Sequence, residues 1–184
     1  MTKVIIIDRD GVINFDTKGY IKSPDEWSAI PGSLEAIAQF NRSGYQVFIA
    51  TNQSGIGRGF YDVAALDTIH EKLMNELAAV GGHVEEIFFC PHHPNDDCGC
   101  RKPKPGLFHS IQKKYQVDLT ETFFIGDSWS DVQAAVHANC QPVLVLTGNG
   151  QRTLAEHPEL KHILNFANLA AAADYICHQR QEKK

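Results

Sequence analysis

The acidic residues of two short segments have the types and spacing needed for magnesium binding or acid–base chemistry. Asp8 and Asp10 follow an apolar run at residues 4–7, and residues two apart on a strand point to the same side. Two like charges this close need a cation or a proton between them, and Mg²⁺ takes oxygen ligands and commonly accompanies substrate phosphate. Asp127 offers a third oxygen, and Asp131 follows one helical turn later. A solvated turn is the alternative for an isolated Asp-x-Asp pair.

Two further segments carry residues that suit a phosphate. The Thr-Asn-Gln-Ser segment at residues 51–54 offers a hydroxyl and backbone N–H groups, although an ordinary polar turn has the same composition. Lys102 can neutralise charge on a transferring phosphoryl group, and Arg101 can clamp a second phosphate through two hydrogen bonds. A solvated loop is the alternative for this basic segment, residues 101–105.

Three thiols and an imidazole, a combination that favours zinc, lie within eleven residues. Cys90, His92, Cys98 and Cys100 match the four-ligand set of a closed structural zinc site. His93 competes with His92 for the same place, and a disulfide or a metal-free loop is the alternative. A reducing compartment and the tight Cys-x-Cys spacing disfavour a disulfide, so we expect zinc. Closing the loop around the metal would also fix the two cations that follow Cys100.

Several other functions are disfavoured. No G-x-S-x-G segment is present for a serine hydrolase, and Tyr61 and Asp62 stand where a dinucleotide fingerprint needs its last glycine. A net charge of −5, from 17 Lys and Arg against 22 Asp and Glu, disfavours nucleic-acid binding. No apolar run approaches the 18 or so residues of a membrane span, and Asp8 comes too soon for a signal peptide. We therefore expect a cytoplasmic protein with no nucleic-acid or membrane partner.

Short apolar runs alternate with helical patterns along the 184 residues, which places these side chains on a scaffold. We expect strands at residues 4–7, 47–50, 87–89, 123–125 and 143–146, with a weaker one near Ile163. The first expected helix has Ser33 as its N-cap and ends at Gly44, and the second runs from Asp62 to Gly81 with Val63 on its apolar face. A third begins at about Pro105, a fourth contains Val132, Ala135 and Val136, and a fifth begins at Asn168. The alternation predicts an α/β fold in which helices cover both faces of a parallel sheet. The length is that of a single domain, residues 1–184, with a loop inserted at about residues 90–105.

Ligands of such a sheet bind at the carboxyl ends of its strands. Asp8 and Asp10 follow the first expected strand, Thr51 follows the second and Asp127 follows the fourth. Because parallel strands end at one edge, we expect these side chains to gather there.

Together these segments resemble the four motifs of the haloacid dehalogenase (HAD) superfamily of phosphatases, in the same order along the chain. The matching residues are Asp8-x-Asp10-Gly11, Thr51-Asn52, Lys102 before a helix, and Gly126-Asp127-x-x-x-Asp131. The resemblance implies a Rossmann-like HAD fold without a large cap domain. It implies that Asp8 is the nucleophile that forms an aspartyl-phosphate, that Asp10 is the general acid and base, and that Thr51 and Lys102 hold the phosphoryl oxygens. Mg²⁺ would be bound by Asp8, Asp127 and the backbone carbonyl of Asp10.

Within the superfamily, the chain resembles the D-glycero-D-manno-heptose-1,7-bisphosphate 7-phosphatases. The segments that carry this resemblance are DRDGVIN at 8–14, GY at 19–20, TNQSG at 51–55, CPHHP at 90–94, CGCRKP at 98–103 and GDS at 126–128. It implies a monomer with a structural zinc that hydrolyses the 7-phosphate of a small sugar bisphosphate, in the synthesis of ADP-heptose for lipopolysaccharide. The implied substrate contacts are Asp16, Gly19, Tyr20, Thr51, Asn52, Gln53, Ser54, Arg101 and Lys102.

The chain departs from that family pattern at two places. Ser128 stands where some members have Lys, and the stretch at residues 16–20 is one residue longer than the usual form. Histidinol-phosphate phosphatases share the zinc loop and are the alternative family. A zinc-ribbon-like binding module is disfavoured because all four ligands lie in one short loop, and an inactive relative is disfavoured because Asp8 and Asp10 are both present.

Overall fold

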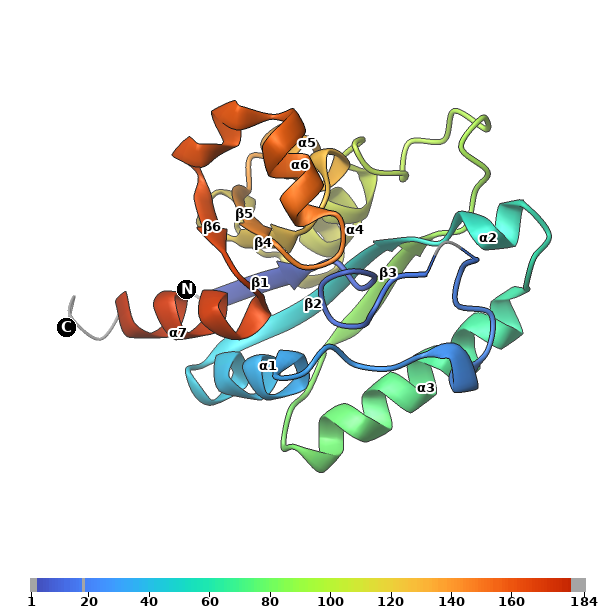
Figure 1. Ribbon diagram of the computed structural model, residues 1–184, viewed down its shortest axis with the longest axis horizontal. Coiled ribbons are helices and arrows are strands. Elements are labelled where there is room, and N and C mark those ends of the chain that lie inside the picture. The colour runs from blue at the N-terminus through green and yellow to red at the C-terminus, as the bar shows by residue number, and fades with distance from the viewer. Residues whose placement is uncertain (1–2, 18, 180–184) are drawn as a thin grey trace.

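Six parallel strands form one sheet in the computed structural model, which describes residues 3–17 and 19–179. The strands are β1 (Lys3–Ile7), β2 (Tyr45–Asn52), β3 (Glu86–Cys90), β4 (Phe123–Gly126), β5 (Gln141–Val145) and β6 (Leu164–Phe166). Their order is β3-β2-β1-β4-β5-β6, so the chain builds outward from β1 first to one side and then to the other (Figure 1). The predicted parallel sheet is confirmed, and its switch in direction lies beside β1, where such sheets bind ligands.

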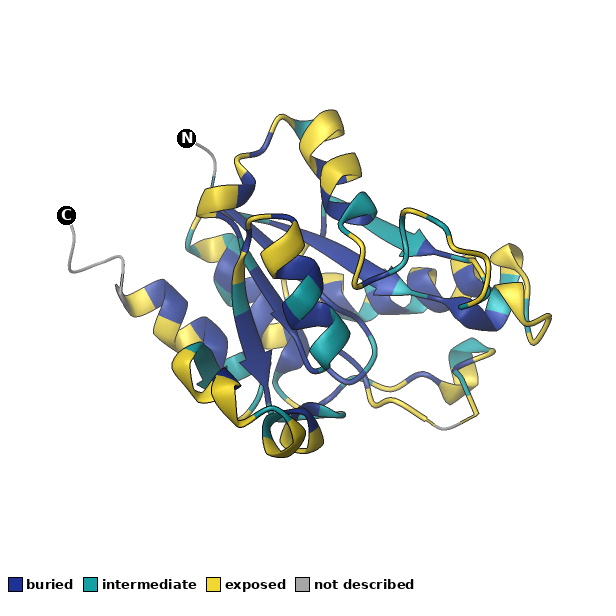
Figure 2. Ribbon diagram, turned by 90° about the horizontal axis from the view of Figure 1, so that it is seen from above, coloured by how far each residue is buried: buried dark blue, intermediate teal, exposed yellow. Residues whose placement is uncertain are grey.

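Helices cover both faces of the sheet, as expected. Helices α1 (Ser33–Arg42), α3 (Val63–Ala79) and α7 (Leu169–Gln179) pack on one face, and α4 (Gly106–Tyr115) and α5 (Trp129–His137) pack on the other. The shorter helices are α2 (Ser54–Gly57) and α6 (Gly150–Glu156), with 3₁₀ turns η1 (Pro24–Glu26), η2 (Leu119–Glu121) and η3 (Pro158–His162). Figure 2 shows the buried strands lying between helices whose outer sides are exposed. Among the described residues, none of the helices could serve as a membrane span.

Strand β1 is buried on both faces, which explains why residues 4–7 are all apolar. Ile5 and Ile7 join the core beneath α1, α3 and α7, whereas Val4 and Ile6 join the core beneath α4 and α5. Each of these four side chains is at most 3% exposed. Burial of one such side chain stabilises the fold by about 1.5–3 kcal/mol. The strand therefore fixes the point at which residue 8 leaves the sheet.

Three local predictions are wrong. Ser33 is the first residue of α1 rather than its N-cap, because Gly32 occupies the cap with a φ of +82° and the Ser33 hydroxyl donates to the carbonyl of Ile13 at 2.6 Å. Val63 and Val136 were counted among the apolar positions that define their helices, but they are 45% and 57% exposed. Helices α2 and α6 were not anticipated. The predicted cap of α3 is confirmed, since the carboxylate of Asp62 accepts from the backbone N–H of Ala65 at 2.8 Å.

Two long connections leave the carboxyl edge of the sheet. Residues 8–32 follow β1 and, where described, contain only the short turn η1. Residues 91–105 follow β3 and form the extended yellow-green loop at the upper right of Figure 1. This second connection coincides with the loop insertion expected from the sequence.

Candidate active site

Side chains that follow β1 and β4 meet a lysine from the 91–105 loop in a buried charge cluster. The Nζ atom of Lys102 lies 2.8 Å from Oδ1 of Asp8 and 2.7 Å from Oδ1 of Asp131. Oxygen atoms of Asp8, Asp127 and Asp131 lie within 4.8 Å of one another, and Lys102 is only 3% exposed. The strand ends thus bring together residues that the sequence placed in separate segments.

The cluster carries more negative charge than one lysine balances. Burial raises the pKa of Asp8 to about 7 against the opposing charge of Lys102, with a further rise caused by Asp131. Burial, together with the charges of Asp131 and Asp8, raises the pKa of Asp127 to about 8. Burial alone would lower the pKa of Lys102, but the two carboxylates beside it raise it, so the lysine stays charged. A cation that accepts oxygen ligands, such as Mg²⁺, fits this set of carboxylates and would balance their excess negative charge.

Asp131 orients Lys102 from the first turn of α5. Its Oδ2 atom accepts from the backbone N–H of Ser128 at 3.0 Å and from the Ser128 hydroxyl at 2.6 Å, which leaves Oδ1 facing the lysine. Ser128 and Asp131 together form a capping box for α5. Ser128 is therefore the helix cap at the position where some relatives are expected to have Lys.

A tight approach of two glycines holds Asp127. Gly11 has a φ of +80°, and a Cβ added there would lie 2.3 Å from Oδ2 of Asp127. A Cβ added at Gly148 would lie 2.2 Å from the same atom. The backbone N–H of Asn149 donates to this oxygen at 2.6 Å. The loop after β5 thus fixes one of the expected metal ligands.

The Asp10 side chain does not join the three-carboxylate cluster and pairs instead with Arg9. Nη2 of Arg9 lies 2.8 Å from Oδ1 and 3.0 Å from Oδ2 of Asp10, while Asn14 and Gln53 donate to the same carboxylate at 3.0 and 2.8 Å. Burial alone would raise the pKa of Asp10, but the charge of Arg9 and the hydrogen bonds from Asn14, Arg9 and Gln53 lower it. The carboxyl group is therefore ionised without substrate.

The residues at the end of β2 support this site in two ways. Thr51 Oγ1 accepts from Gln53 at 2.8 Å, so the Thr51 proton is directed to another acceptor, such as a phosphoryl oxygen. Asn52 holds the main chain of Lys102, accepting from its N–H at 3.1 Å and donating to its carbonyl at 3.2 Å. The side chains of Asn52 and Gln53, expected at the substrate, are thus engaged within the protein. Ser54 is buried at the start of α2.

Three of the expected substrate contacts lie on the loop after β1. Asp16 and Gly19 are exposed, and Tyr20 is half-buried with its ring 5.3 Å from the ring of Phe60. Partial desolvation and the charge of Asp10 raise the pKa of Asp16, which places Asp16 within electrostatic reach of Asp10. The expected insertion in this loop includes residue 18, which lies outside the described residues.

Arg101 lies beside a cavity of about 200 Å³ that Cys98 and Lys102 also line. Its Nη1 atom is buried and has no hydrogen-bond acceptor among the residues that the structure describes. A buried cationic donor in this state suits an anion, in line with the second-phosphate role expected for Arg101. Lys104, two residues further on, is exposed and pairs with Asp97.

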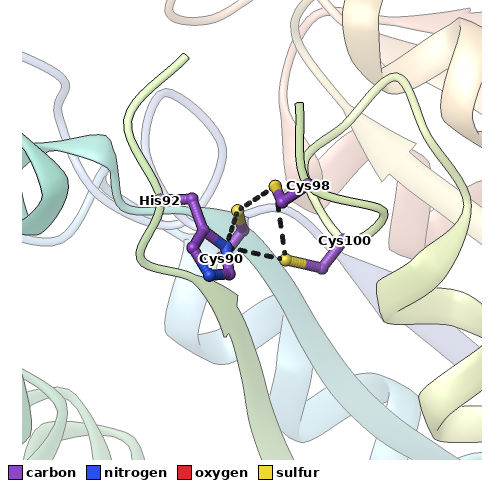
Figure 3. Close-up of side chains that lie close together, drawn as sticks. All are labelled: Cys90, His92, Cys98 and Cys100. Carbon is purple, nitrogen blue, oxygen red and sulfur yellow. Dashed lines mark hydrogen bonds between the residues drawn. The ribbon is translucent and has the colours of Figure 1, made fainter. Parts of the chain in front are cut away.

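The four expected zinc ligands converge in the 91–105 loop and at the end of β3 (Figure 3). Nδ1 of His92 lies 3.5 Å from the sulfur of Cys90 and 3.2 Å from that of Cys100, and Cys98 lies 3.5 and 3.6 Å from the same two sulfurs. A tetrahedron with metal–sulfur bonds of about 2.3 Å has edges of about 3.8 Å, close to these separations. The arrangement is compatible with zinc. It uses His92, whereas Nδ1 of His93 accepts from the backbone N–H of Asn95.

Four residues of the site were not anticipated from the sequence. Arg9 is 1% exposed although it stands between two aspartates after a strand, where a surface arginine is the usual expectation. His70 on α3 contacts this arginine, and Tyr61, which precedes α3, contacts Gln53. No local sequence pattern predicts either contact. Asn149 had a usable signal, because Thr-Gly-Asn-Gly at residues 147–150 follows a strand and polar strand ends mark the ligand edge.

The chain is similar to known phosphatases over nearly its whole length. It is 49% identical over 179 residues to the D-glycero-beta-D-manno-heptose-1,7-bisphosphate 7-phosphatase of Bordetella bronchiseptica, covering 96% of this chain and 99% of that protein. It is 52% identical to the protein of the same name from Pseudomonas aeruginosa, covering 94% and 97%. The chain belongs to this phosphatase family. The family's name favours heptose bisphosphate over histidinol phosphate, the alternative that the sequence left open.

Solved structures and a family model agree with membership of the heptose bisphosphate phosphatase family. A crystal structure of D,D-heptose 1,7-bisphosphate phosphatase from B. bronchiseptica, complexed with magnesium and phosphate, matches with a TM-score of 0.93 at 48% identity, covering 96% of this chain and 99% of that one. The enzyme of the same name from Burkholderia thailandensis matches with a TM-score of 0.74 at 41% identity, covering 95% and 98%. The HAD-hydrolase-like family model matches residues 99–172. The HAD fold expected from the motifs is confirmed.

Proposed function

We propose that this chain is a magnesium-dependent phosphatase that removes the 7-phosphate of D-glycero-β-D-manno-heptose 1,7-bisphosphate through an aspartyl-phosphate. The observation that carries the proposal is the buried contact of Lys102 with Asp8 and Asp131 beside Asp127, in a chain about half identical to enzymes of that name. The product would serve the synthesis of ADP-heptose for lipopolysaccharide. The choice of the β anomer follows the relatives' name.

In the first half-reaction, a carboxylate oxygen of Asp8 forms a bond to the phosphorus of the 7-phosphate, and the bond from phosphorus to the sugar oxygen breaks. Lys102 and Thr51 donate to the non-bridging oxygens, which reduces repulsion between Asp8 and the incoming dianion. Asp10 gives a proton to the departing sugar oxygen. A phosphate dianion nearby raises the pKa of a carboxyl group, so substrate binding favours the protonated Asp10 that this step needs.

In the second half-reaction, water attacks the phosphorus of the aspartyl-phosphate and the bond to the Asp8 oxygen breaks. Asp10, ionised after the first step, takes the proton of the attacking water. Inorganic phosphate is released, and both carboxyl groups return to their starting states. The hydrogen bonds to Asp10 keep the carboxyl group in the unprotonated form, which is the form that can accept this proton.

Two metals have separate places in this proposal. The carboxylates of Asp8 and Asp127 and the backbone carbonyl of Asp10 would hold Mg²⁺, which supplies positive charge against the reacting phosphoryl group. Zinc would be structural. Its proposed ligands are Cys90, His92, Cys98 and Cys100. Because Lys102 follows Cys100 by two residues, a closed zinc site limits the positions that the lysine can adopt.

Arg101 would bind the second phosphate of the substrate, since its buried Nη1 lacks an acceptor among the described residues. Histidinol phosphate has no second phosphate, and an arginine repels its positive groups. We further infer a single-domain, monomeric, cytoplasmic enzyme without a nucleic-acid or membrane partner. Residues 90–105 would be its zinc loop.

The test compares kcat/KM for heptose 1,7-bisphosphate, fructose 1,6-bisphosphate and histidinol phosphate with Mg²⁺ present. We expect the heptose compound to give the highest value and to lose its 7-phosphate, which ³¹P NMR of the product identifies. Arg101→Ala should raise KM for the bisphosphate more than it lowers kcat. Lys113→Ala, which changes an exposed lysine on α4 away from this cavity, serves as the control. A preference for histidinol phosphate would overturn the substrate assignment, and release of phosphate without Mg²⁺ would overturn the metal assignment.

A further inference from the structure

A buried histidine on α3, which the proposed reaction does not use, contacts the arginine that grips Asp10. Nε2 of His70 lies 3.1 Å from Nη1 of Arg9, and both side chains are buried. An arginine has only donors, so Nε2 of His70 must be the unprotonated acceptor of this bond. Burial and the adjacent Arg9 charge lower the pKa of His70 to about 3, in agreement with a neutral ring.

The same arginine is held from a second side by Gln53. Nη2 of Arg9 donates to Oε1 of Gln53 at 3.2 Å, and the hydroxyl of Tyr61 donates to the same oxygen at 2.7 Å. The Gln53 amide nitrogen donates to Asp10 at 2.8 Å and to Thr51 at 2.8 Å. Both ends of the amide are therefore fully used, and its orientation is fixed by two donors on one end and two acceptors on the other.

The ring of Tyr61 is itself held in place by close packing. A Cβ added at Gly55 would lie 2.2 Å from Cε1 of Tyr61, so the ring lies directly against the glycine backbone. Tyr61 and His70 thus bring the loop before α3, and α3 itself, into contact with residues at the ends of β1 and β2. Neither residue touches the Asp8, Asp127 and Asp131 cluster in any hydrogen bond of the described structure.

We propose that His70 and Tyr61 are positioning residues for Asp10, acting through Arg9 and Gln53. Among the described residues, Arg9, Asn14 and Gln53 give the Asp10 carboxylate five hydrogen bonds. His70 contacts the first of these donors and Tyr61 the third. Loss of the His70 acceptor would leave a buried Arg9 donor without a partner, and such a group moves toward another acceptor or water. The Asp10 carboxylate would move with it, away from the sugar oxygen that it must protonate. The inference rests on the acid–base role proposed for Asp10.

The test uses a pair of substrates that differ in their need for an acid. The sugar oxygen of heptose bisphosphate leaves well only if it is protonated, whereas p-nitrophenolate leaves as a stable anion. Because kcat/KM reports on steps up to aspartyl-phosphate formation, misplacing the acid lowers this ratio for the sugar and not for p-nitrophenyl phosphate. A purely structural defect lowers kcat/KM for both substrates by the same factor.

Three variants separate positioning from stability. His70→Leu removes the acceptor and should lower kcat/KM for heptose bisphosphate by roughly 10- to 100-fold, against less than about threefold for p-nitrophenyl phosphate. His70→Gln places an amide oxygen near the position of Nε2 and should restore most of the loss. Leu73→Ala, which removes a buried side chain one turn further along α3, should lower the Tm without any difference between the two substrates.

The outcomes distinguish this inference from the proposed function. Equal losses for both substrates in His70→Leu, or no rescue by His70→Gln, would overturn the positioning role. If His70→Leu fails to fold, Tyr61→Phe keeps the ring and removes only the hydroxyl; a selective loss for the sugar supports the inference and no selectivity refutes it. Asp10→Asn is the reference variant. If it also lowers kcat/KM equally for both substrates, the acid role of Asp10 is wrong. If only Asp10→Asn shows a selective loss for the sugar, the result refutes the positioning by His70 and Tyr61 and leaves the acid role of Asp10 standing.

Discussion

Replacing Lys102 by Met tests whether the carboxylate cluster depends on its one buried cation. Methionine keeps most of the volume of the side chain and removes the charge. Asp8, Asp127 and Asp131 would then face one another within 4.8 Å without the lysine that pairs with two of them in the described structure. We expect a loss of both stability and activity, for reasons that pH can separate.

The distances set the size of the effect. At an effective dielectric constant of about 20, unit charges 2.8 Å apart attract by about 6 kcal/mol, and Lys102 makes two such contacts. The cost of burying the lysine charge, several kcal/mol, offsets part of this attraction. The carboxylates can also take up protons, which limits the damage. Removal of one partner from a buried ion pair typically costs about 3–5 kcal/mol, which corresponds to a fall in Tm of roughly 6–20 °C for a chain of this size.

The sign of the pH dependence follows from the raised pKa values. Lys102 lowers the pKa values of Asp8 and Asp127, so its loss moves both further above about 7 and about 8. A folded-state pKa above the unfolded value means that the folded protein holds the proton more tightly. The resulting stability is present at low pH and is lost as the pH rises through the folded-state pKa. The deficit of Lys102→Met should therefore be smallest near pH 5 and largest above pH 8.

Thermal unfolding of metal-free protein at pH 5, 7 and 8.5 measures this deficit, together with the rate of phosphate release. Lys104→Met is the matched control, because this lysine lies in the same loop but is exposed. The Tm of the Lys104→Met variant should match that of the unchanged protein at each pH. A Lys102→Met deficit that is the same at pH 5 and 8.5 would refute the electrostatic reasoning. Full activity in this variant would refute the phosphoryl contact.

Three further predictions concern the proposed nucleophile and the two proposed metals. Asp8→Asn should lower kcat by at least about 10³-fold and leave the Tm unchanged or higher, because one of three crowded carboxylates is removed while Lys102 keeps its ion pair with Asp131. Ordinary turnover in this variant would exclude Asp8 as the nucleophile. Elemental analysis should find about one zinc per chain, and Cys98→Ser should lose the metal and most of the activity together, whereas active enzyme without zinc would contradict the structural role. Metal-free protein should lose stability as the pH rises from about 4 to about 8, because the folded-state pKa values of Asp8 and Asp127 are raised. Mg²⁺ should therefore raise the Tm more at pH 8 than at pH 5.5. An equal rise in Tm at the two pH values would show that these carboxylates do not bind Mg²⁺.

The sequence predicted those features of the site that follow from strand ends. A wholly apolar run at residues 4–7 indicates a central parallel strand, and the residue after it must then lie at the carboxyl edge, which is where Asp8 is found. The same reasoning places Asp127. The four proposed zinc ligands could be grouped because they are close in sequence, although only the structure separates His92 from His93.

The residues that escaped prediction depend on partners far along the chain. Ser33 resembles an N-cap by type, but Gly32 takes the cap position and the Ser33 hydroxyl donates to the carbonyl of Ile13, which only the folded loop brings near. His70 occupies the buried face of α3 at the spacing of a core residue, and its contact with Arg9 spans 61 positions. Periodicity reports which face of a helix is buried but not which polar group it meets there.

The way in which Asn52 holds Lys102 limits where the 91–105 loop can change length. Asn52 binds the N–H and carbonyl of residue 102, groups that every residue except proline provides, so it fixes the place of that position rather than the identity of its side chain. Between Cys100 and position 102 there is one residue, and an insertion there would displace the lysine by up to about 3.5 Å. That shift exceeds the 2.8 and 2.7 Å that separate its Nζ atom from Asp8 and Asp131. Between His92 and Cys98 an extra residue lengthens a loop that carries none of the four expected zinc ligands. The entropic cost is a few tenths of a kcal/mol, beside a rearrangement of the turn in which Asp96 N–H donates to the carbonyl of His93. Insertions and deletions that preserve catalysis should therefore be confined to residues 93–97, and engineered changes of loop length belong there.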